Sequence, residues 1–380
     1  MRTINYLLLA VAVLIFISLF IIKKHEIIEK KWQRRTVCIV GWLVALLLIL
    51  VVVFFPSYPP VPVTGPYPYQ VQTIQFTQPD RKDPYRPEQN RTLVMDYYYP
   101  VSDQLACHSV PLIIFSHGGI STKTSNVSLF TELASHGYVV ASLDHPYQAI
   151  STVIDGRRVW MDGGYFREMM GENSHRDIEN SFACFQRWMD IRIQDMEAAL
   201  HYLTDRATQG EKAFAFINPK AIGAAGHSLG GSAALGLARL RPDIQAVLVL
   251  ESPYMADITG ISDGEFTWNQ AAYEAAILNI YSDSGMPLVQ TDHKYAQNRN
   301  HLVHTDKLDY LHIEGTNHFT LTDLVLQSPL FCKLIGGNYQ TAGEDGLKQI
   351  NRAALAFFDK NLKNRLTIES LVHISLNKVY

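Results

Sequence analysis

Two uncharged apolar runs at the start of the chain most constrain how it can fold. Residues 36–55 contain no charged side chain over twenty positions, and residues 6–22 contain none over seventeen. An α-helix rises about 1.5 Å per residue, so twenty residues cover the roughly 30 Å hydrocarbon core of a bilayer, and seventeen are just enough. Both runs are therefore predicted to be membrane-spanning helices.

The basic loop between the two runs predicts their orientation. Residues 23–35, KKHEIIEKKWQRR, carry six Lys or Arg against two Glu. Short loops rich in Lys and Arg stay in the cytoplasm. The chain is thus expected to begin with a transmembrane hairpin in the cell membrane, with everything after residue 55 on the extracytoplasmic side. A signal peptide is the alternative for the first run, but no small-residue cleavage site follows it.

A proline-rich stretch separates the hairpin from the rest of the chain. Residues 56–68 contain six prolines, which favour extended polyproline geometry. We expect this stretch to be a linker and residues 69–380 to form one globular domain. Hydrophobic residues make up 47% of the chain and charged residues 18%, which fits a packed core with an added lipid-facing segment.

In the globular part, short apolar runs bounded by turn residues alternate with helical patterns. This order is expected of a mostly parallel sheet covered by helices on both faces. An Asp155-Gly156 pair between two short runs predicts a two-residue hairpin. Strands are predicted at residues 71–76, 92–99, 112–116, 138–143, 221–225, 246–250, 277–281 and 310–313, and helices at 128–135, 191–204, 229–240 and 346–362.

Charge and cysteine content argue against several classes of partner. The formal net charge of -3 gives no reason to expect nucleic acid. The four cysteines show no CxxC or Cys/His spacing, so neither a disulfide framework nor a zinc site is indicated. No metal and no cofactor are expected.

The strongest chemical motif is GHSLGG at residues 226–231. It follows a predicted strand and precedes a predicted helix. This is the context of the GxSxG nucleophile elbow, in which glycines relieve crowding in a strained turn that holds the serine oxygen clear of the sheet. The motif predicts an α/β-hydrolase fold with Ser228 as nucleophile. A glycine-rich packing turn is the structural alternative.

A serine hydroxyl is a weak nucleophile, so a histidine must take its proton and a carboxylate must orient that histidine. In this fold the chain order is serine, acid, histidine. His318, on a loop after the last predicted strand, is the expected general base. Glu251 and Asp283 both lie just past strand ends, at the sheet edge where sites collect. These positions alone leave the choice of acid open.

Hydrolysis also needs donors for the oxyanion that forms on the attacked carbonyl, and backbone N–H groups can supply them. Leu229, directly after Ser228, is one expected donor. The sequence FSHGG at 115–119 ends an earlier strand in the manner of an HGG oxyanion loop, which makes Gly119 the second. His117 is expected to hold this loop. The whole constellation predicts ester hydrolysis through an acyl-enzyme.

Together these motifs resemble the plasma-type platelet-activating factor acetylhydrolases and their bacterial relatives. The resemblance covers roughly residues 64–318, through GPY at 65–67, FSHGG, LASHGYVVASLDH at 133–145, GHSLGG and a closing GTNH. This family places its acid a little over twenty residues beyond the serine, which favours Glu251 over Asp283. The family usually has Asp there, and its vertebrate plasma members have no transmembrane hairpin.

The resemblance implies calcium-independent hydrolysis of short or oxidised acyl esters, notably the acetyl ester of a glycerophospholipid. A lipid-like or small ester is therefore the expected substrate. Residues 160–188 are rich in Phe, Met and Tyr. We interpret them as a lid or interfacial surface, with ordinary core packing as an alternative of equal weight.

Other functions are compatible with parts of this pattern. A general esterase, a cutinase-like enzyme or an extracytoplasmic serine peptidase would keep the same fold and triad. A peptidase would need an amine-recognising carboxylate pair or a propeller domain, and the sequence indicates neither. A non-catalytic membrane protein with a hydrolase fold is disfavoured by the intact serine, histidine and oxyanion-loop motifs.

Overall fold

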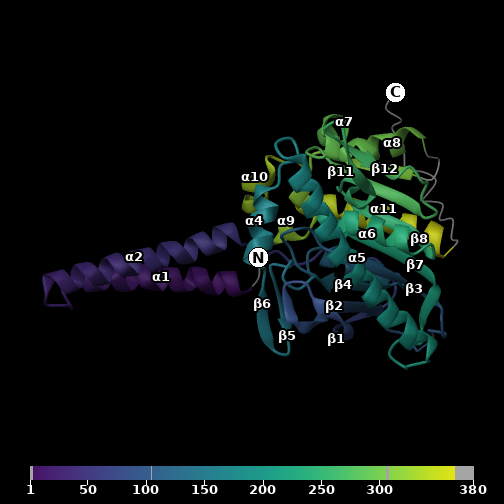
Figure 1. The fold of residues 1–380 in the computed structure, drawn as a ribbon. Helices are drawn as coiled ribbons and strands as arrows, with labels where there is room; N and C mark the ends of the chain where they lie inside the picture. The colour runs from purple at the N-terminus through teal and green to yellow at the C-terminus, as the bar shows by residue number, and fades with distance from the viewer. Residues whose placement is uncertain (1–2, 104, 305–307, 364–380) are drawn as a thin grey trace.

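A long helical hairpin projects from a globular domain in the computed structural model, which describes residues 3–103, 105–304 and 308–363 (Figure 1). The hairpin consists of α1 (Thr3–Lys24) and α2 (Lys31–Phe54), which contain most of the two predicted spans. Both helices are long and apolar enough to cross a membrane. They pack closely at Gly41, where a Cβ atom would lie 2.7 Å from Cδ2 of Leu19.

The globular domain is built on an eight-stranded sheet. Its strand order is β1-β2-β4-β3-β7-β8-β11-β12, with β1, β2 and β4 paired antiparallel and every later pair parallel. All eight predicted strands are confirmed, and most extend beyond the predicted limits. Their bounds are β1 Tyr69–Asp83, β2 Arg86–Pro100, β3 Val110–Ser116, β4 Val139–Asp144, β7 Ile217–His227, β8 Ile244–Leu250, β11 Ala276–Ser282 and β12 Leu308–Ile313.

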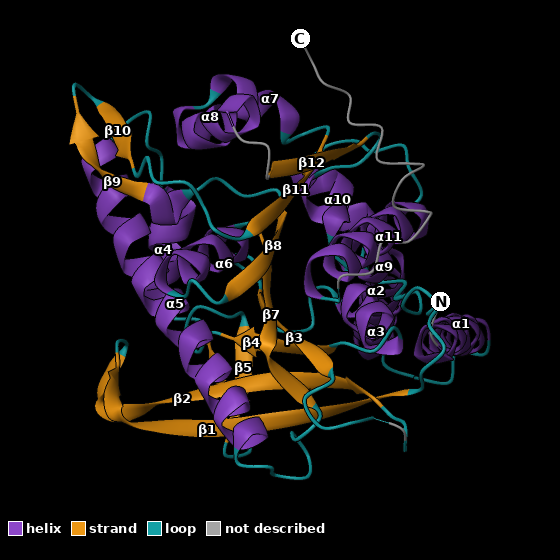
Figure 2. Cartoon of the chain, turned by 90° about the vertical axis from the view of Figure 1, so that its right-hand side faces the viewer, coloured by secondary structure: helices purple, strands orange, loops and turns teal. Residues whose placement is uncertain are grey.

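Helices cover both faces of this sheet, which Figure 2 shows edge-on. One face packs on α5 (Ile178–Thr208) and α6 (Leu229–Leu240), and the other on α3 (Val127–Ser135) and α11 (Gly343–Leu362). Central strands covered on both faces are nearly continuous apolar runs, as β3 and β8 are here. The mostly parallel sheet and its flanking helices confirm the predicted fold class.

The predicted helices at 128–135, 191–204, 229–240 and 346–362 are confirmed as α3, α5, α6 and α11. Of the further elements outside the main sheet, only one is predicted. The hairpin of β5 (Ser151–Ile154) and β6 (Arg157–Trp160) turns at Asp155-Gly156 as expected. A second hairpin, β9 (Ile258–Ser262) and β10 (Glu265–Trp268), turns at Asp263-Gly264 and is not predicted. The helices missed by the sequence patterns are α4 Gly163–Gly171, α7 Met286–Thr291, α8 Ala296–His304, α9 Leu324–Gln327 and α10 Pro329–Gly336.

The proline-rich stretch after α2 contains no helix or strand and is hydrogen-bonded to the globular domain. The backbone N–H of Tyr58 donates to the carbonyl oxygen of Leu326 at 2.8 Å. Further along, N–H of Val61 donates to Oγ of Ser128 at 3.1 Å, and N–H of Thr64 donates to Oε2 of Glu132 at 2.8 Å. The stretch therefore runs along the domain as a docked strap. Of the predicted domain over residues 69–380, positions 364–380 lie outside the described residues.

A short polar contact ties the segment after β12 to the beginning of α3. The side chain of Asn126 donates to the carbonyl oxygen of Leu321 at 2.9 Å, and the N–H of Ser128 donates to a carboxylate oxygen of Asp323 at 2.7 Å. An acceptor at a helix N-terminus satisfies one of its free N–H groups. Burial raises the pKa of Asp323 to about 6, although hydrogen bonds from Ser128 and Val127 oppose the shift.

Asp323 should make the stability of the folded chain depend on pH. Folded Asp323 keeps its proton up to about pH 6, whereas an unfolded aspartate loses it near pH 4. The contribution of this group to the free energy of unfolding should therefore fall as pH rises between those values, by about 2 to 3 kcal/mol. Asp323→Asn, which cannot ionise, should lack this component.

Thermal unfolding in detergent at pH 4.5 and pH 7 measures the effect. The wild-type chain should lose more stability between these pH values than the variant does. An equal loss in both proteins would contradict the assignment.

Candidate active site

The turn between β7 and α6 holds Ser228 in a strained backbone conformation. Its φ is +52° and its ψ is -129°, a region that side chains rarely adopt. The surrounding backbone is too close for side chains. A Cβ atom on Gly226 would lie 2.2 Å from the carbonyl carbon of Gly230, and one on Gly230 would lie 2.0 Å from the carbonyl oxygen of Ser116. Both glycines are therefore required by the turn, as the elbow motif predicts.

His318 and Glu251 form a direct pair. Nδ1 of His318 lies 2.8 Å from Oε1 of Glu251, whose side chain is 1% exposed while that of His318 is 26% exposed. The other oxygen of Glu251 accepts from the N–H and the hydroxyl of Ser282. The N–H of His318 donates to Oγ of Ser284 at 2.9 Å. Ser282 thus fixes the carboxylate of Glu251, and Ser284 fixes the backbone that carries the imidazole of His318.

The carboxylate of Glu251 is suited to stabilising a positively charged imidazole. Burial alone raises the pKa of Glu251, but the hydrogen bonds from His318 and Ser282 outweigh burial, so its pKa lies below the usual value. Glu251 is consequently ionised at neutral pH. A buried, ionised carboxylate can hold a histidine ring in one tautomer and favour its protonated form.

The second candidate acid, Asp283, lies elsewhere. One of its carboxylate oxygens lies 2.7 Å from Nε2 of His312, and the other accepts from the N–H of Gly315 at 2.9 Å. Asp283 is about half exposed. Of the two carboxylates left open by sequence position, the structure brings Glu251 to His318 and Asp283 to His312.

His318 lies beside the elbow through its contact with His227. The two rings are 4.5 Å apart between centroids, and Nε2 of His227 lies 3.0 Å from the carbonyl oxygen of His318. Burial, together with repulsion from His318, lowers the pKa of His227 to about 3. Among the described residues no hydrogen bond joins Oγ of Ser228 to the ring of His318. Such bonds are often long in free enzymes and tighten when substrate binds.

The expected oxyanion donors belong to two backbone segments that meet at the elbow. Ser116, the last residue of β3, pairs in register with Gly226 at the end of β7. A Cβ atom on Gly118 would lie 3.5 Å from Cβ of Ser228. Within the described part of the chain, the N–H groups of Gly119 and Leu229 have no hydrogen-bond acceptor. Both N–H groups are therefore free to bind an oxygen atom.

Residues 160–188 divide between a cover over this loop and the core beneath it. On α4, the hydroxyl of Tyr165 donates to the carbonyl oxygen of Gly119 at 3.0 Å. The methyl group of Met169 would lie 2.4 Å from a Cβ atom at Gly119. On α5, Phe185 and Trp188 are buried core residues. The first half of the segment thus covers the candidate site, whereas the second half is core packing.

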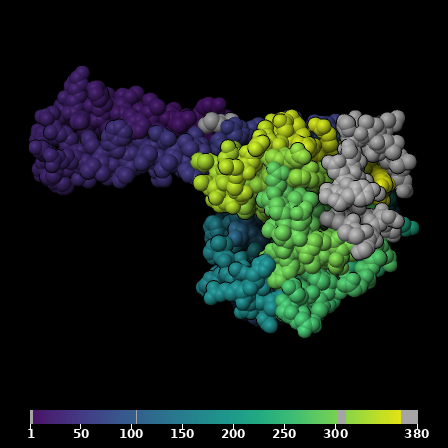
Figure 3. All heavy atoms as spheres, turned by 90° about the horizontal axis from the view of Figure 1, so that it is seen from above, coloured from purple at the N-terminus to yellow at the C-terminus, as the bar shows by residue number. Residues whose placement is uncertain are grey.

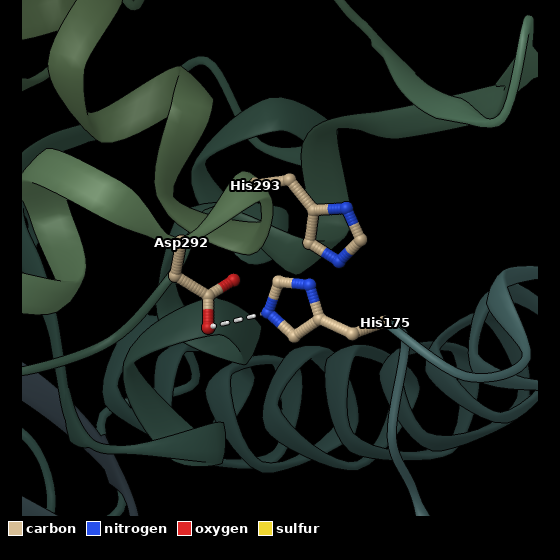
Figure 4. Close-up of side chains that lie close together, drawn as sticks. All are labelled: His175, Asp292 and His293. Carbon is tan, nitrogen blue, oxygen red and sulfur yellow. Dashed lines mark ion pairs between the residues drawn. The ribbon is translucent and has the colours of Figure 1, made fainter.

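One group of potential metal ligands is found among the described residues, and sequence spacing does not reveal it. His175, Asp292 and His293 have ligand atoms within 4.8 Å of one another (Figure 4). The two imidazole rings are stacked, 4.4 Å apart and only 5° from parallel. Nε2 of His293 lies 2.7 Å from Oγ of Ser174. The nitrogen lone pairs of two parallel stacked rings do not point at one shared position, as ligands of one metal ion would. We therefore interpret the group as a structural contact that joins the loop before α5 to the segment after α7.

A sequence profile for the family described as "Platelet-activating factor acetylhydrolase, isoform II" matches residues 91–370, about three quarters of the chain. The chain belongs to this family. Membership in the platelet-activating factor acetylhydrolase family places it among ester-hydrolysing enzymes, as its motifs predict.

Two further comparisons concern the sequence of one relative and the fold of another. A protein from Arthroderma benhamiae, named a probable 1-alkyl-2-acetylglycerophosphocholine esterase, is 29% identical over 129 residues. That match spans 34% of this chain and only 27% of the relative. The structure of a ferulic acid esterase from Streptomyces cinnamoneus superposes with a TM-score of 0.62 at 19% identity, covering 82% of this chain and 95% of its own. This second likeness concerns the fold.

The positions of Glu251 and Asp283 predict different effects on kcat when each carboxylate is replaced by its amide. Glu251→Gln should lower kcat on a short-acyl ester by about 10²- to 10⁴-fold, because an amide can hold the imidazole in the wrong tautomer and cannot balance its charge. Asp283→Asn, with its partner at His312, should stay within a few-fold of wild type. Turnover of p-nitrophenyl acetate per mole of folded enzyme gives the comparison. A larger loss in the Asp283 variant would reverse the assignment.

Proposed function

We propose that this chain is a membrane-anchored serine esterase that releases short or oxidised acyl groups from phospholipid-like esters, in the manner of a 1-alkyl-2-acetylglycerophosphocholine esterase. The observation that carries the proposal is the 2.8 Å pair of His318 and Glu251 beside the strained Ser228. Nucleophile, base and acid come from three separate loops. All three loops follow strands at the carboxyl edge of the parallel sheet.

In the proposed reaction, Oγ of Ser228 attacks the acyl carbonyl carbon while Nε2 of His318 takes the hydroxyl proton. Glu251 keeps Nδ1 of His318 protonated and stabilises the imidazolium. His318 then gives its proton to the departing alcohol oxygen, which leaves an acyl group bound to Ser228. Water, deprotonated by His318, attacks this ester and releases the carboxylic acid, and the proton returns to Ser228.

The two free N–H groups supply the remaining part of the mechanism. The negative charge that forms on the carbonyl oxygen would bind the N–H of Gly119 and the N–H of Leu229. Backbone donors held in place before the reaction stabilise this charge without further reorganisation. Loss of one such donor typically costs about 10²- to 10³-fold in kcat.

The substrate class is proposed from the family and from one relative. The family takes its name from hydrolysis of an acetyl ester, and the relative's name specifies a 1-alkyl-2-acetylglycerophosphocholine. The position of Met169 against Gly119 leaves little room beside the oxyanion loop, which supports a short acyl group. No metal or cofactor is needed for the proposed steps.

Membrane anchoring is proposed from the hairpin and from the domain surface around it. The helices α4 and α10 lie at the end of the domain from which the hairpin extends (Figures 1 and 3). Apolar side chains on both are exposed, among them Phe166, Met170, Phe331, Leu334 and Ile335. The hydroxyl of Ser328 also donates to the carbonyl oxygen of Phe54 at the end of α2. This end of the domain would therefore rest on the bilayer, where an amphiphilic ester is available.

Removing the nucleophile tests the reaction type. Ser228→Ala should lower hydrolysis of short-acyl esters by several orders of magnitude, since a triad acts as a unit. Ser262→Ala, which changes an exposed serine on β9, is the matched control and should behave as wild type. The assay compares acetyl, butyryl and palmitoyl phospholipid esters with peptide amides. Faster hydrolysis of the amides would favour a peptidase, and wild-type turnover by Ser228→Ala would exclude the proposed mechanism.

The exposed Cys107 allows the proposed topology to be tested in intact cells. A membrane-impermeant maleimide should label Cys107, and the label should disappear in Cys107→Ser. A second protein, Glu29→Cys in the Cys107→Ser background, places a thiol in the basic loop between the helices. This thiol should react only after the cells are permeabilised. The opposite labelling pattern would invert the proposed orientation.

A further inference from the structure

Arg192 on α5 is a buried cation without a carboxylate partner. Its exposed fraction is 0%. Among the described residues, no Asp or Glu oxygen lies within 4.0 Å of its guanidinium nitrogens. The nearby Arg91 is equally buried, yet it pairs with Asp195 at 2.6 Å and with Asp83 at 2.7 Å. Because an unpaired buried charge is costly, Arg192 calls for an explanation beyond packing.

The partners of Arg192 are the carbonyl oxygens of the candidate oxyanion loop. Nη1 donates to the carbonyl oxygen of His117 at 2.5 Å, and Nη2 donates to that of Gly118 at 3.2 Å. Nε donates to Oε1 of Gln148 at 2.7 Å, which fixes the guanidinium plane. The next carbonyl along the chain, that of Gly119, accepts from the hydroxyl of Tyr165. The carbonyl groups of three successive residues, 117 to 119, thus accept hydrogen bonds from the side chains of Arg192 and Tyr165.

These contacts determine where the N–H of Gly119 points. The carbonyl of Gly118 and the N–H of Gly119 belong to one planar trans peptide group, in which C=O and N–H point in opposite directions. Arg192 holds the oxygen end of that group, so the N–H end is directed away from Arg192. The guanidinium charge also polarises the same peptide group, in a buried site where electrostatic effects are stronger than in water.

The neighbouring acid is engaged with other cations and a histidine. Asp195 is fully buried and lies close to Arg91, Arg81 and His145. No ion pair joins Asp195 to Arg192 in the described part of the chain. The positive charge nearest to the oxyanion loop is therefore left uncompensated by a carboxylate, as would suit a site that gains negative charge during reaction.

We propose that Arg192 is a positioning residue that orients the N–H of Gly119 toward the substrate and places positive charge behind it. This inference rests on the proposed function, in which Gly119 is an oxyanion donor. It predicts that Arg192 matters more in the transition state than in substrate binding, because the oxyanion exists only there.

Substitutions at Arg192 separate its charge from its shape. Arg192→Gln should lower kcat on a short-acyl ester by about 10- to 100-fold, somewhat less than direct loss of an oxyanion donor, with KM changed less than about threefold. Arg192→Lys keeps the charge but loses the fork, so it should recover part of the rate. Tyr165→Phe, which removes only the hydroxyl that holds Gly119, should cause a smaller loss in kcat.

Arg239→Gln is the control for removing a partly buried, ion-paired arginine outside the site. Arg239 pairs with Asp257 near the far end of α6 from Ser228. This variant should lose thermal stability but keep its kcat, calculated per reactive serine. Titration with a fluorophosphonate counts the reactive serines in every preparation, and thermal unfolding reports folding. If Arg192→Gln fails to fold, Arg192→Lys and Tyr165→Phe carry the test.

Each outcome decides one of the two proposals. A lower kcat with unchanged KM and a full count of reactive serines supports the role of Arg192. A kcat of Arg192→Gln within threefold of wild type overturns it. If Arg192→Gln does not fold, a kcat within threefold of wild type in both Arg192→Lys and Tyr165→Phe overturns it. So does a loss that appears only in KM or in the count of reactive serines. Wild-type turnover in Ser228→Ala would instead overturn the proposed function.

Discussion

The candidate site depends on a place where three backbone segments approach so closely that two positions must be glycine. The end of β3, the end of β7 and the start of α6 meet at Ser116, Gly226 and Gly230, where added Cβ atoms would lie 2.0 to 2.2 Å from neighbouring backbone. This approach forces the chain into a sharp turn and gives Ser228 its positive φ. It also brings the loop after β3 alongside the start of α6. The N–H groups of Gly119 and Leu229 thus come near the same serine.

The polar groups around that turn explain how the candidate oxyanion loop keeps its shape in an apolar interior. Arg192 and Tyr165 hold its carbonyl groups, and the ring of His145 lies 2.8 Å from Oγ of Ser116. Burial lowers the pKa of His145 to about 4 and keeps it neutral at physiological pH. Buried polar groups with satisfied hydrogen bonds specify one arrangement, because any other arrangement leaves donors or acceptors unpaired. The candidate oxyanion loop is therefore held in place by the buried side chains of Arg192 and Tyr165.

Local sequence patterns predict the main sheet because its strands and helices follow simple periodic rules. Each central strand is buried on both faces, so it appears as a short apolar run, and all eight runs are strands. The hairpin at Asp263-Gly264 carries the same turn signal as Asp155-Gly156, and both turns have positive φ at each residue. The sequence pattern does not reveal it because β9 (ITGIS) lacks a regular alternation of apolar and polar residues and β10 is only four residues long. The short helices α7 to α10 have no long amphipathic pattern and are stabilised by tertiary contacts.

The same distinction applies to the candidate site. A motif with fixed spacing locates Ser228, and the chain order of the fold points to His318, because both signals are local or topological. Distances between loops cannot be read from spacing, which is why residue positions alone did not choose between Glu251 and Asp283. No motif or spacing in the sequence assigns Arg192 to the site. It lies in the middle of a long helix, and only the folded chain shows that its neighbours are carbonyl groups instead of carboxylates.

The docked strap connects this catalytic geometry to the proposed anchor. Residues 56–68 are bonded along α3 and the segment after His318, so the hairpin cannot swing freely relative to the domain. At the same junction, the side chain of Asn5 donates to the carbonyl oxygens of Phe55 and Pro56, and so ties the start of α1 to the end of α2. With the hairpin in a bilayer, a fixed junction would hold the exposed apolar residues of α4 and α10 at one depth. On this proposal α4, which lies against the candidate oxyanion loop through Tyr165 and Met169, would be the same helix that contacts lipid.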